Sequence, residues 1–120
     1  MTPDPKPDRR IIDKLLMRAL HAQWRECALC DEHRGRLSIH HVWKHPRHDL
    51  RENTVMLCGD GVRGCHGKIE AGDHETRRQL GEHILDERPD VFAFLVEMTG
   101  GEEQAKAWME RHLHVAIADS

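Results

Sequence analysis

The chain has 120 residues, with 18 Lys+Arg, 21 Asp+Glu, 11 His and four Cys. This length favours one domain. No run approaches the ~18 apolar residues that a membrane-spanning helix needs, and the first residues lack the apolar segment of a signal peptide, so we expect a cytoplasmic protein with no membrane partner. In a reducing compartment, cysteines indicate metal ligands or catalytic thiols before they indicate disulfides.

Charge is distributed unevenly along the chain. Residues 1–51 contain 11 Lys+Arg and seven Asp+Glu, whereas residues 52–120 contain seven and 14. The basic half is therefore the part that we expect to contact a polyanion. The alternative is that these charges only lie on solvated faces of helices and loops.

The N-terminal part is predicted to contain an arm and one helix. Residues 1–7 include three prolines, which predicts a disordered arm ahead of a single domain over residues 8–120. Apolar residues then recur on one helical stripe from Ile11 onward. We therefore expect a helix over about residues 9–24, with Asp8 as its N-cap.

Two strands and a short helix are predicted next. LSIHHVW (37–43) alternates like a half-buried strand, and NTVMLC (53–58) is the next strand candidate, after a polar loop that contains Pro46. CHGKIEAG (65–72) then predicts a short helix. The order strand, loop, strand, helix gives a fold of the α+β class.

Helices are predicted throughout the C-terminal extension, residues 73–120. Asp73 caps a helix that runs to about Arg88, Pro89 opens a second that stops at Gly100, and a third runs from Glu102 to about His114. We expect this extension to be a packing scaffold that lies against the first helix.

Four cysteines form two pairs in two separate reversals of the chain. Cys27-x2-Cys30 and Cys58-x6-Cys65 can together supply the four thiolates of a tetrahedral structural Zn²⁺ site. Such an ion would couple metal binding to folding. The alternatives are free buried cysteines or a redox Cys-x-x-Cys, although no βαβ pattern precedes Cys27.

Histidines concentrate beside these cysteines. Five of them fall within 16 residues, namely His33, His40, His41, His45 and His48. His40-His41 end the first strand, where a turn into the loop can bring both imidazoles to one site. One can then ligate a divalent cation while the other stays neutral and accepts a proton from water.

Further side chains fit the same chemistry. His66 on the short helix is the natural second metal ligand, and the Asn53 amide can bond either the loop backbone or the base imidazole. Cations in the loop are placed to contact phosphates: Lys44, Arg47 and Arg51. Together these groups are what hydrolysis of a phosphodiester requires. His45 and His48 are expected to be solvated.

The joint pattern resembles a known family. Cys27-x2-Cys30, Ile39-His-His-Val42, Asn53-Thr-Val-Met-Leu-Cys58 and Cys65-His66 resemble the HNH endonucleases, in the subgroup whose ββα-metal motif is framed by a four-cysteine zinc site. The resemblance covers about residues 27–72. The C-terminal helices are similar to those that trail small phage-encoded HNH proteins, which would place the protein in the host cell cytoplasm.

The resemblance implies a role for each matched position. His40 would be a ligand of the catalytic metal, His41 the general base, Asn53 the residue that orients His41, and His66 the second ligand. One turn later, Glu70 is the candidate for a further ligand or substrate contact, and His74 is another. The substrate would be DNA, cut to 5′-phosphate and 3′-hydroxyl ends. The catalytic cation would be Mg²⁺, with Mn²⁺, Ni²⁺ or Zn²⁺ as alternatives.

Two other functions use the same features. A zinc-stabilised nucleic-acid-binding module would use the basic loop without catalysis. A docking protein would present its acidic C-terminal helices to a larger phage packaging or recombination enzyme. The His-His, Asn and His set favours the nuclease, because a binding module has no need of it beside a zinc site. The sequence leaves the oligomeric state open.

Overall fold

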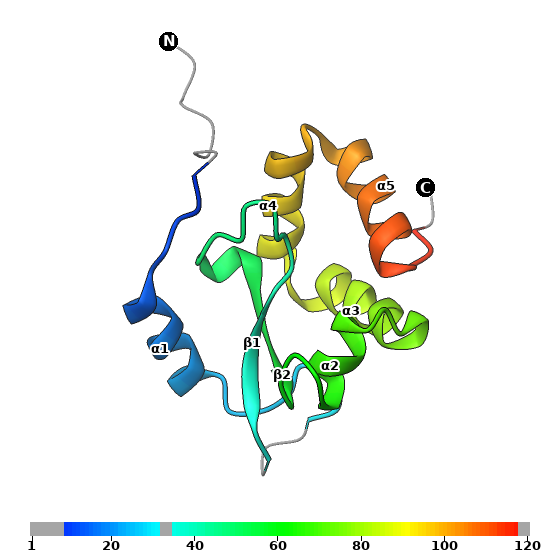
Figure 1. Ribbon diagram of the computed structural model, residues 1–120. Coiled ribbons are helices and arrows are strands. Elements are labelled where there is room, and N and C mark those ends of the chain that lie inside the picture. Colours follow the sequence, from blue (N-terminus) through cyan, green and yellow to red (C-terminus); the bar gives the residue numbers. More distant parts are fainter. Residues whose placement is uncertain (1–8, 32–34, 118–120) are drawn as a thin grey trace.

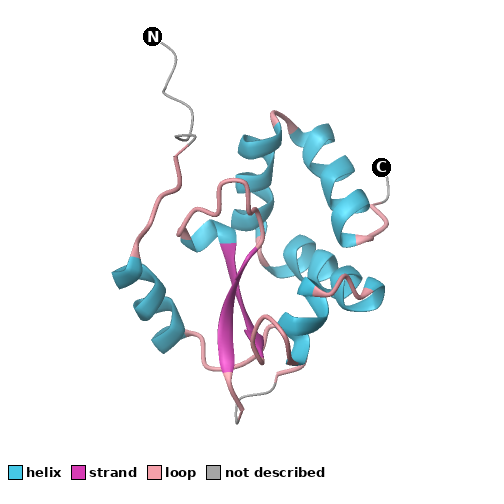
Figure 2. Ribbon diagram, viewed as in Figure 1, coloured by secondary structure: helices cyan, strands magenta, loops and turns pink. Residues whose placement is uncertain are grey.

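A computed structural model describes residues 9–31 and 35–117; the predicted arm, residues 1–7, and the predicted cap Asp8 lie outside the described residues. The elements, in chain order, are α1 (Lys14–Gln23), β1 (Leu37–His41), the 3-10 turn η1 (Arg51–Asn53), β2 (Thr54–Cys58), α2 (Gly64–Glu70), α3 (His74–Glu87), α4 (Pro89–Thr99) and α5 (Glu102–Leu113). Helices surround one pair of strands (Figure 2), which confirms the predicted α+β class. Among the described residues, every helix is too short or too polar to span a bilayer.

The two strands pair in an antiparallel register that separates the neighbouring histidines. His40 lies opposite Val55 and His41 lies opposite Thr54. Paired residues point to the same face of a sheet and successive residues to opposite faces. His40 therefore shares the face of the core residue Val55 and is 3% exposed, whereas His41 lies on the other face.

The first helix is shorter than predicted. It begins at Lys14, and its N-cap is Asp13, whose carboxylate accepts a hydrogen bond from the backbone N–H of Leu16 at 2.9 Å. Ile11 extends the apolar period but lies outside the helix, because its carbonyl oxygen, which a helix would pair with the Leu15 N–H, accepts from the Asp49 N–H at 2.8 Å instead. The N-terminal boundary at residue 9 was therefore wrong by about one turn.

The C-terminal helices begin and end where local signals predicted. Asp73 caps α3 by accepting from the Thr76 N–H at 2.9 Å, Pro89 opens α4, and Gly100 ends it at a φ of +98°. The predicted packing against the first helix is wrong. Helices α3 to α5 pack on one another, on α2 and on η1, whereas α1 packs against β1 on the far side of the hairpin (Figure 1).

Candidate active site and metal centres

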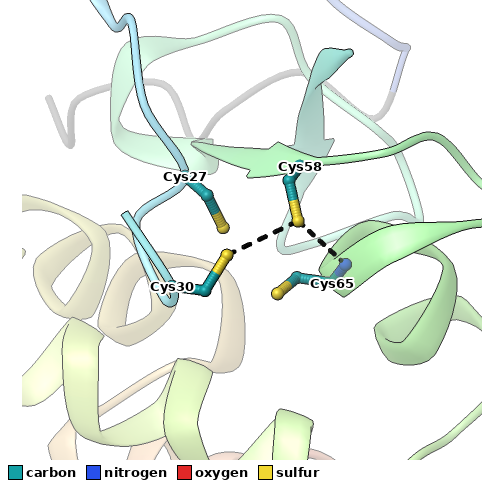
Figure 3. Close-up of side chains that lie close together, drawn as sticks. All are labelled: Cys27, Cys30, Cys58 and Cys65. Atoms are coloured by element: carbon teal, nitrogen blue, oxygen red, sulfur yellow. Dashed lines mark hydrogen bonds between the residues drawn. The ribbon is translucent and has the colours of Figure 1, made fainter. Parts of the chain in front are cut away.

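Four cysteine side chains converge at one end of the hairpin. Cys27 and Cys30 lie in the turn after α1, Cys58 ends β2 and Cys65 lies in the first turn of α2, and their sulfurs lie within 4.8 Å of one another (Figure 3). The Cys30 and Cys58 sulfurs are 3.6 Å apart. Backbone N–H groups donate to two of the sulfurs, from Leu29 to Cys27 at 3.4 Å and from Cys65 to Cys58 at 3.3 Å. This cluster could hold a metal ion such as zinc.

The six-residue spacing between Cys58 and Cys65 is absorbed by a compact turn. The Asp60 carboxylate accepts from the N–H groups of Val62 and Arg63, both at 2.9 Å. Gly64 has a φ of +69°, and a Cβ there would lie 2.5 Å from the Cys58 carbonyl oxygen. The chain thus folds back on itself, which returns Cys65 to Cys58 despite the long insert.

The environment of Cys58 favours the thiolate form that ligates metals. Burial alone would raise the pKa of Cys58. The Cys65 N–H and the neighbouring thiols donate to its sulfur, however, and hold the pKa of Cys58 below its ordinary value. A thiolate is the form that binds zinc.

A second group of candidate metal ligands lies where β1 ends beside α2. The side chains of His40, His66 and Glu70 each offer a ligand atom, all within 4.8 Å of one another. The Glu70 Oε1 atom lies 3.2 Å from His40 Nδ1 and 3.5 Å from His66 Nε2. His66 and Glu70 are four residues apart on α2, so they share one helix face. Two predicted ligands and the further candidate Glu70 are therefore brought together.

The hydrogen bonds of His66 leave one ring nitrogen available. The Ser38 hydroxyl donates its proton to the Gly59 carbonyl at 2.8 Å, so its oxygen accepts from His66 Nδ1 at 2.6 Å. A neutral imidazole with its proton on Nδ1 has its lone pair on Nε2. That nitrogen is the one nearest Glu70, and a hydrogen bond to the opposite nitrogen is the usual support of a metal-bound histidine.

His40 also fits a metal ligand. Its Nδ1 is buried. Glu70 Oε1 lies 3.2 Å away, but the angles of this contact are not those of a hydrogen bond, so among the described residues the nitrogen has no hydrogen-bond partner. Burial lowers the pKa of His40 to about 4, so the ring is neutral at pH 7. Contact with His40 and with the Lys44 ammonium keeps the pKa of Glu70 well below its usual value. Two neutral imidazoles and a carboxylate form a donor set for a divalent cation.

His41 is held by an acidic residue that sequence reasoning missed. Its Nε2 lies 2.8 Å from Asp49 Oδ1, and the other Asp49 oxygen accepts from the Asp13 N–H at 2.9 Å. Burial works against the Asp49 charge, yet these two bonds lower the pKa of Asp49. Burial lowers the pKa of His41. A neutral His41 therefore donates from Nε2 and keeps its lone pair on Nδ1.

Asn53 has a different role from the one that the resemblance implied. Its side-chain oxygen accepts from the Trp43 N–H at 2.7 Å, and its amide nitrogen donates to the carbonyls of Trp43 and His48 at 2.9 and 3.0 Å. The fully buried amide thus closes the loop between the strands. Of the two predicted partners of Asn53, the loop backbone and the base imidazole, the structure shows the loop backbone. Asp49, and not Asn53, positions the His41 ring.

Two of the three predicted phosphate contacts lie at the site. A pocket of about 300 Å³ is lined by Ile39, His41, Lys44, Arg47, Gly61, His66 and Glu70. Lys44 Nζ is 2.5 Å from Glu70 Oε2. Arg51 lies elsewhere: its guanidinium bonds the Gln23 side chain at 3.1 Å and lies 5.2 Å from the centroid of the Trp24 ring.

Two other histidines differ from expectation. His74 is outside the ligand group, because its ring stacks on that of His114 with centroids 4.3 Å apart. His48 was expected to be solvated but is fully buried, and its Nδ1 accepts from the Ile11 N–H at 2.9 Å. The polar composition of the loop suggested an exposed ring. The burial of His48 could not be predicted locally, because its hydrogen-bond partner Ile11 lies 37 residues earlier in the chain.

Comparison with known proteins adds no assignment. The chain matches no family model, and neither a curated protein nor a solved structure matches it.

Proposed function

We propose that the protein is a metal-dependent endonuclease of the HNH type, which hydrolyses phosphodiester bonds of DNA. One observation carries the proposal: two candidate metal ligands, His66 and Glu70, line one pocket together with a carboxylate-held histidine and two cations, and the third candidate ligand, His40, lies 3.2 Å from Glu70. His40, His66 and Glu70 would hold a divalent cation, and His41 would be the general base. The four cysteines would hold a structural zinc ion.

The pocket residues suit each step of the hydrolysis. His41 Nδ1 accepts a proton from water, and the water oxygen forms a bond to phosphorus as the bond from phosphorus to the 3′ oxygen breaks. The 3′ oxygen takes up a proton from solvent, which leaves 5′-phosphate and 3′-hydroxyl ends. The Asp49 carboxylate, 2.8 Å from Nε2, stabilises the imidazolium that forms. A bound divalent cation supplies charge stabilisation at the phosphoryl oxygens and the departing oxygen.

The neighbouring cations suit the same substrate. Arg47 lines the pocket, and Lys44 lies against Glu70 at its edge. Both side chains are more than one-third exposed, so they can reach phosphates next to the cleaved one. Phosphate contacts of this kind position a strand without reading its sequence. We therefore propose DNA as the partner and Mg²⁺, Mn²⁺, Ni²⁺ or Zn²⁺ as the catalytic ion.

The proposal is tested by cleavage of supercoiled plasmid. Zinc-loaded protein is incubated with Mg²⁺, Mn²⁺ or Ni²⁺, and wild type is compared with His41→Ala. Loss of cutting in a variant that keeps its zinc content and circular dichroism supports the base assignment. Equal cutting by both proteins refutes it. Retarded migration of DNA without cleavage under any of these ions favours a zinc-stabilised binding module instead.

A further inference from the structure

A second pocket adjoins the candidate active site. Its volume is about 390 Å³, it shares Lys44 with the first pocket, and His40 forms part of its wall. The remaining lining comes from several elements, among them Trp43 after β1, Ile69 of α2, Arg77 of α3, and Trp108 and His112 of α5. The C-terminal helices therefore do more than pack, because they complete a pocket of the size that binds small ligands.

Aromatic rings dominate the pocket and are fixed in place. The ring centroids of Trp43 and Trp108 are 5.5 Å apart, and that of His112 lies 4.9 Å from Trp108. The Trp43 indole donates to the His45 carbonyl at 3.2 Å. Arg77 is also anchored, since its Nε donates to the Ile69 carbonyl at 3.0 Å. A planar ligand would thus meet a preformed surface.

The charge of the lining restricts the ligand further. Arg77 contributes a guanidinium group and Lys44 an ammonium that also pairs with Glu70, imidazoles add further donors, and none of the described residues that line the pocket is acidic. Apolar and aromatic walls with cations at the edge suit a planar aromatic group that carries a phosphate. Lys44 links this pocket to the one where a phosphodiester is proposed to bind.

We propose that the second pocket receives an unstacked nucleobase of the same strand that is cut. This inference rests on the proposed nuclease function and adds a substrate class to it: single-stranded or distorted DNA, in which a base leaves the stack at little cost. Stacking on aromatic side chains should strengthen binding by about five- to 150-fold per base. Intact duplex should bind more weakly through this pocket.

Tryptophan fluorescence can test the pocket directly. The chain has three tryptophans, and Trp24 lies outside this pocket, so Trp24→Phe leaves Trp43 and Trp108 as reporters. His41→Ala is added to prevent cleavage. The probes are a short thymidine oligonucleotide, an abasic oligomer of equal length and charge, and deoxyadenosine monophosphate.

We expect the thymidine oligonucleotide to change the fluorescence and to bind on the order of tenfold more tightly than the abasic oligomer. Trp108→Leu should remove most of that difference. His112→Glu, at an exposed position of the rim, should weaken binding, whereas Gln104→Glu makes the same charge change on α5 outside the pocket and should not. If Trp108→Leu does not fold, the exposed pair of variants carries the test.

Equal affinity for the thymidine and abasic oligomers would overturn the inference, as would an unchanged difference in Trp108→Leu. Binding of the mononucleotide as tightly as the oligonucleotide would overturn the assignment to a strand and indicate a free nucleotide. Plasmid cleavage by the Trp24→Phe protein, with His41 intact, separates the two proposals. Cutting without base-dependent binding refutes only the pocket. Base-dependent binding without cutting under any ion refutes the nuclease, and with it the cut strand, but leaves a pocket that binds an unstacked base.

Discussion

Replacing Asp49 by Asn should abolish cleavage by changing the tautomer of His41. In the native arrangement, one Asp49 oxygen accepts from the Asp13 backbone N–H and the other accepts from His41 Nε2. The backbone group can only donate, so the single oxygen of the new side-chain amide must face it. The amide nitrogen of the variant then faces His41, whose Nε2 must become the acceptor. The proton moves to Nδ1, and the proposed base has no lone pair for water.

The size of the effect follows from these contacts. Loss of a positioned general base lowers the rate by ~10²–10⁴-fold. Folding should suffer less, because the substituted side chain still pairs with the Asp13 N–H and the His41 ring and loses only the ion pair with Arg10, whose Nη2 lies 3.7 Å from Asp49 Oδ1. The variant loses the negative charge of one buried, hydrogen-bonded carboxylate. Hydrogen bonds to a charged group contribute about 1.5–3 kcal/mol to the free energy of unfolding. Asp49 is 4% exposed, so solvent screens little of this interaction.

The assay is the initial rate of plasmid nicking, with the melting temperature and zinc content measured on the same samples. Asp86→Asn, an identical change at an exposed position of α3, is the matched control and should cut like wild type. Cutting by Asp49→Asn within a few-fold of wild type would contradict this role of Asp49. Loss of activity only in proportion to lost zinc would contradict it as well, because the defect would then be structural.

Three further outcomes are expected. Ser38→Ala should weaken binding of Mn²⁺ by ~10–100-fold without loss of zinc, since His66 Nδ1 loses its acceptor; calorimetry on the zinc-loaded protein measures this, and unchanged affinity would contradict it. The pKa of His40 is lowered from 6.5 to about 4, so the unfolded chain binds more protons at this residue in that window, and the contribution of His40 to the free energy of unfolding should fall by about 3 kcal/mol as the pH drops from 6.5 to 4. Urea unfolding should show a shallower pH dependence in His40→Asn, and an equal slope would exclude this residue as the cause. Gly64→Ala should lower zinc affinity and the melting temperature, because the residue has a positive φ and the new Cβ would lie 2.5 Å from the Cys58 carbonyl oxygen. A spectroscopic zinc-release assay measures the affinity, and a value equal to that of wild type would contradict the prediction.

Local sequence signals were sufficient for most of the elements. Asp73, Pro89 and Gly100 mark helix ends through their own side chains or backbone preferences, and the structure places the ends there. The cysteine spacing likewise predicted one cluster. For the helix ends the cause lies within a few residues of the effect, which is why a single sequence reveals it; the cysteine pairs are far apart in the chain, and it is their shared metal chemistry that predicts their meeting.

Long-range contacts explain what the sequence could not reveal. The apolar period through Ile11 is indistinguishable from a helix until the Ile11 carbonyl is seen to accept from the distant Asp49 N–H rather than from within a helix. Asp49 was equally hidden, although an acidic residue in an otherwise basic loop was an available signal. Arg51 has the same local context as Arg47, and only the packing of α1 shows that its guanidinium faces Trp24.

The segment ahead of α1 is joined to the loop that carries Asp49. Ile11 donates to His48, Asp13 donates to Asp49, and the Arg10 guanidinium donates to the Arg47 carbonyl at 2.8 Å. The proposed base is thus assembled only when a stretch far upstream has docked. If the proposed function is correct, a proteolytic nick or a fusion partner at that stretch should stop cutting while both clusters of candidate metal ligands stay intact.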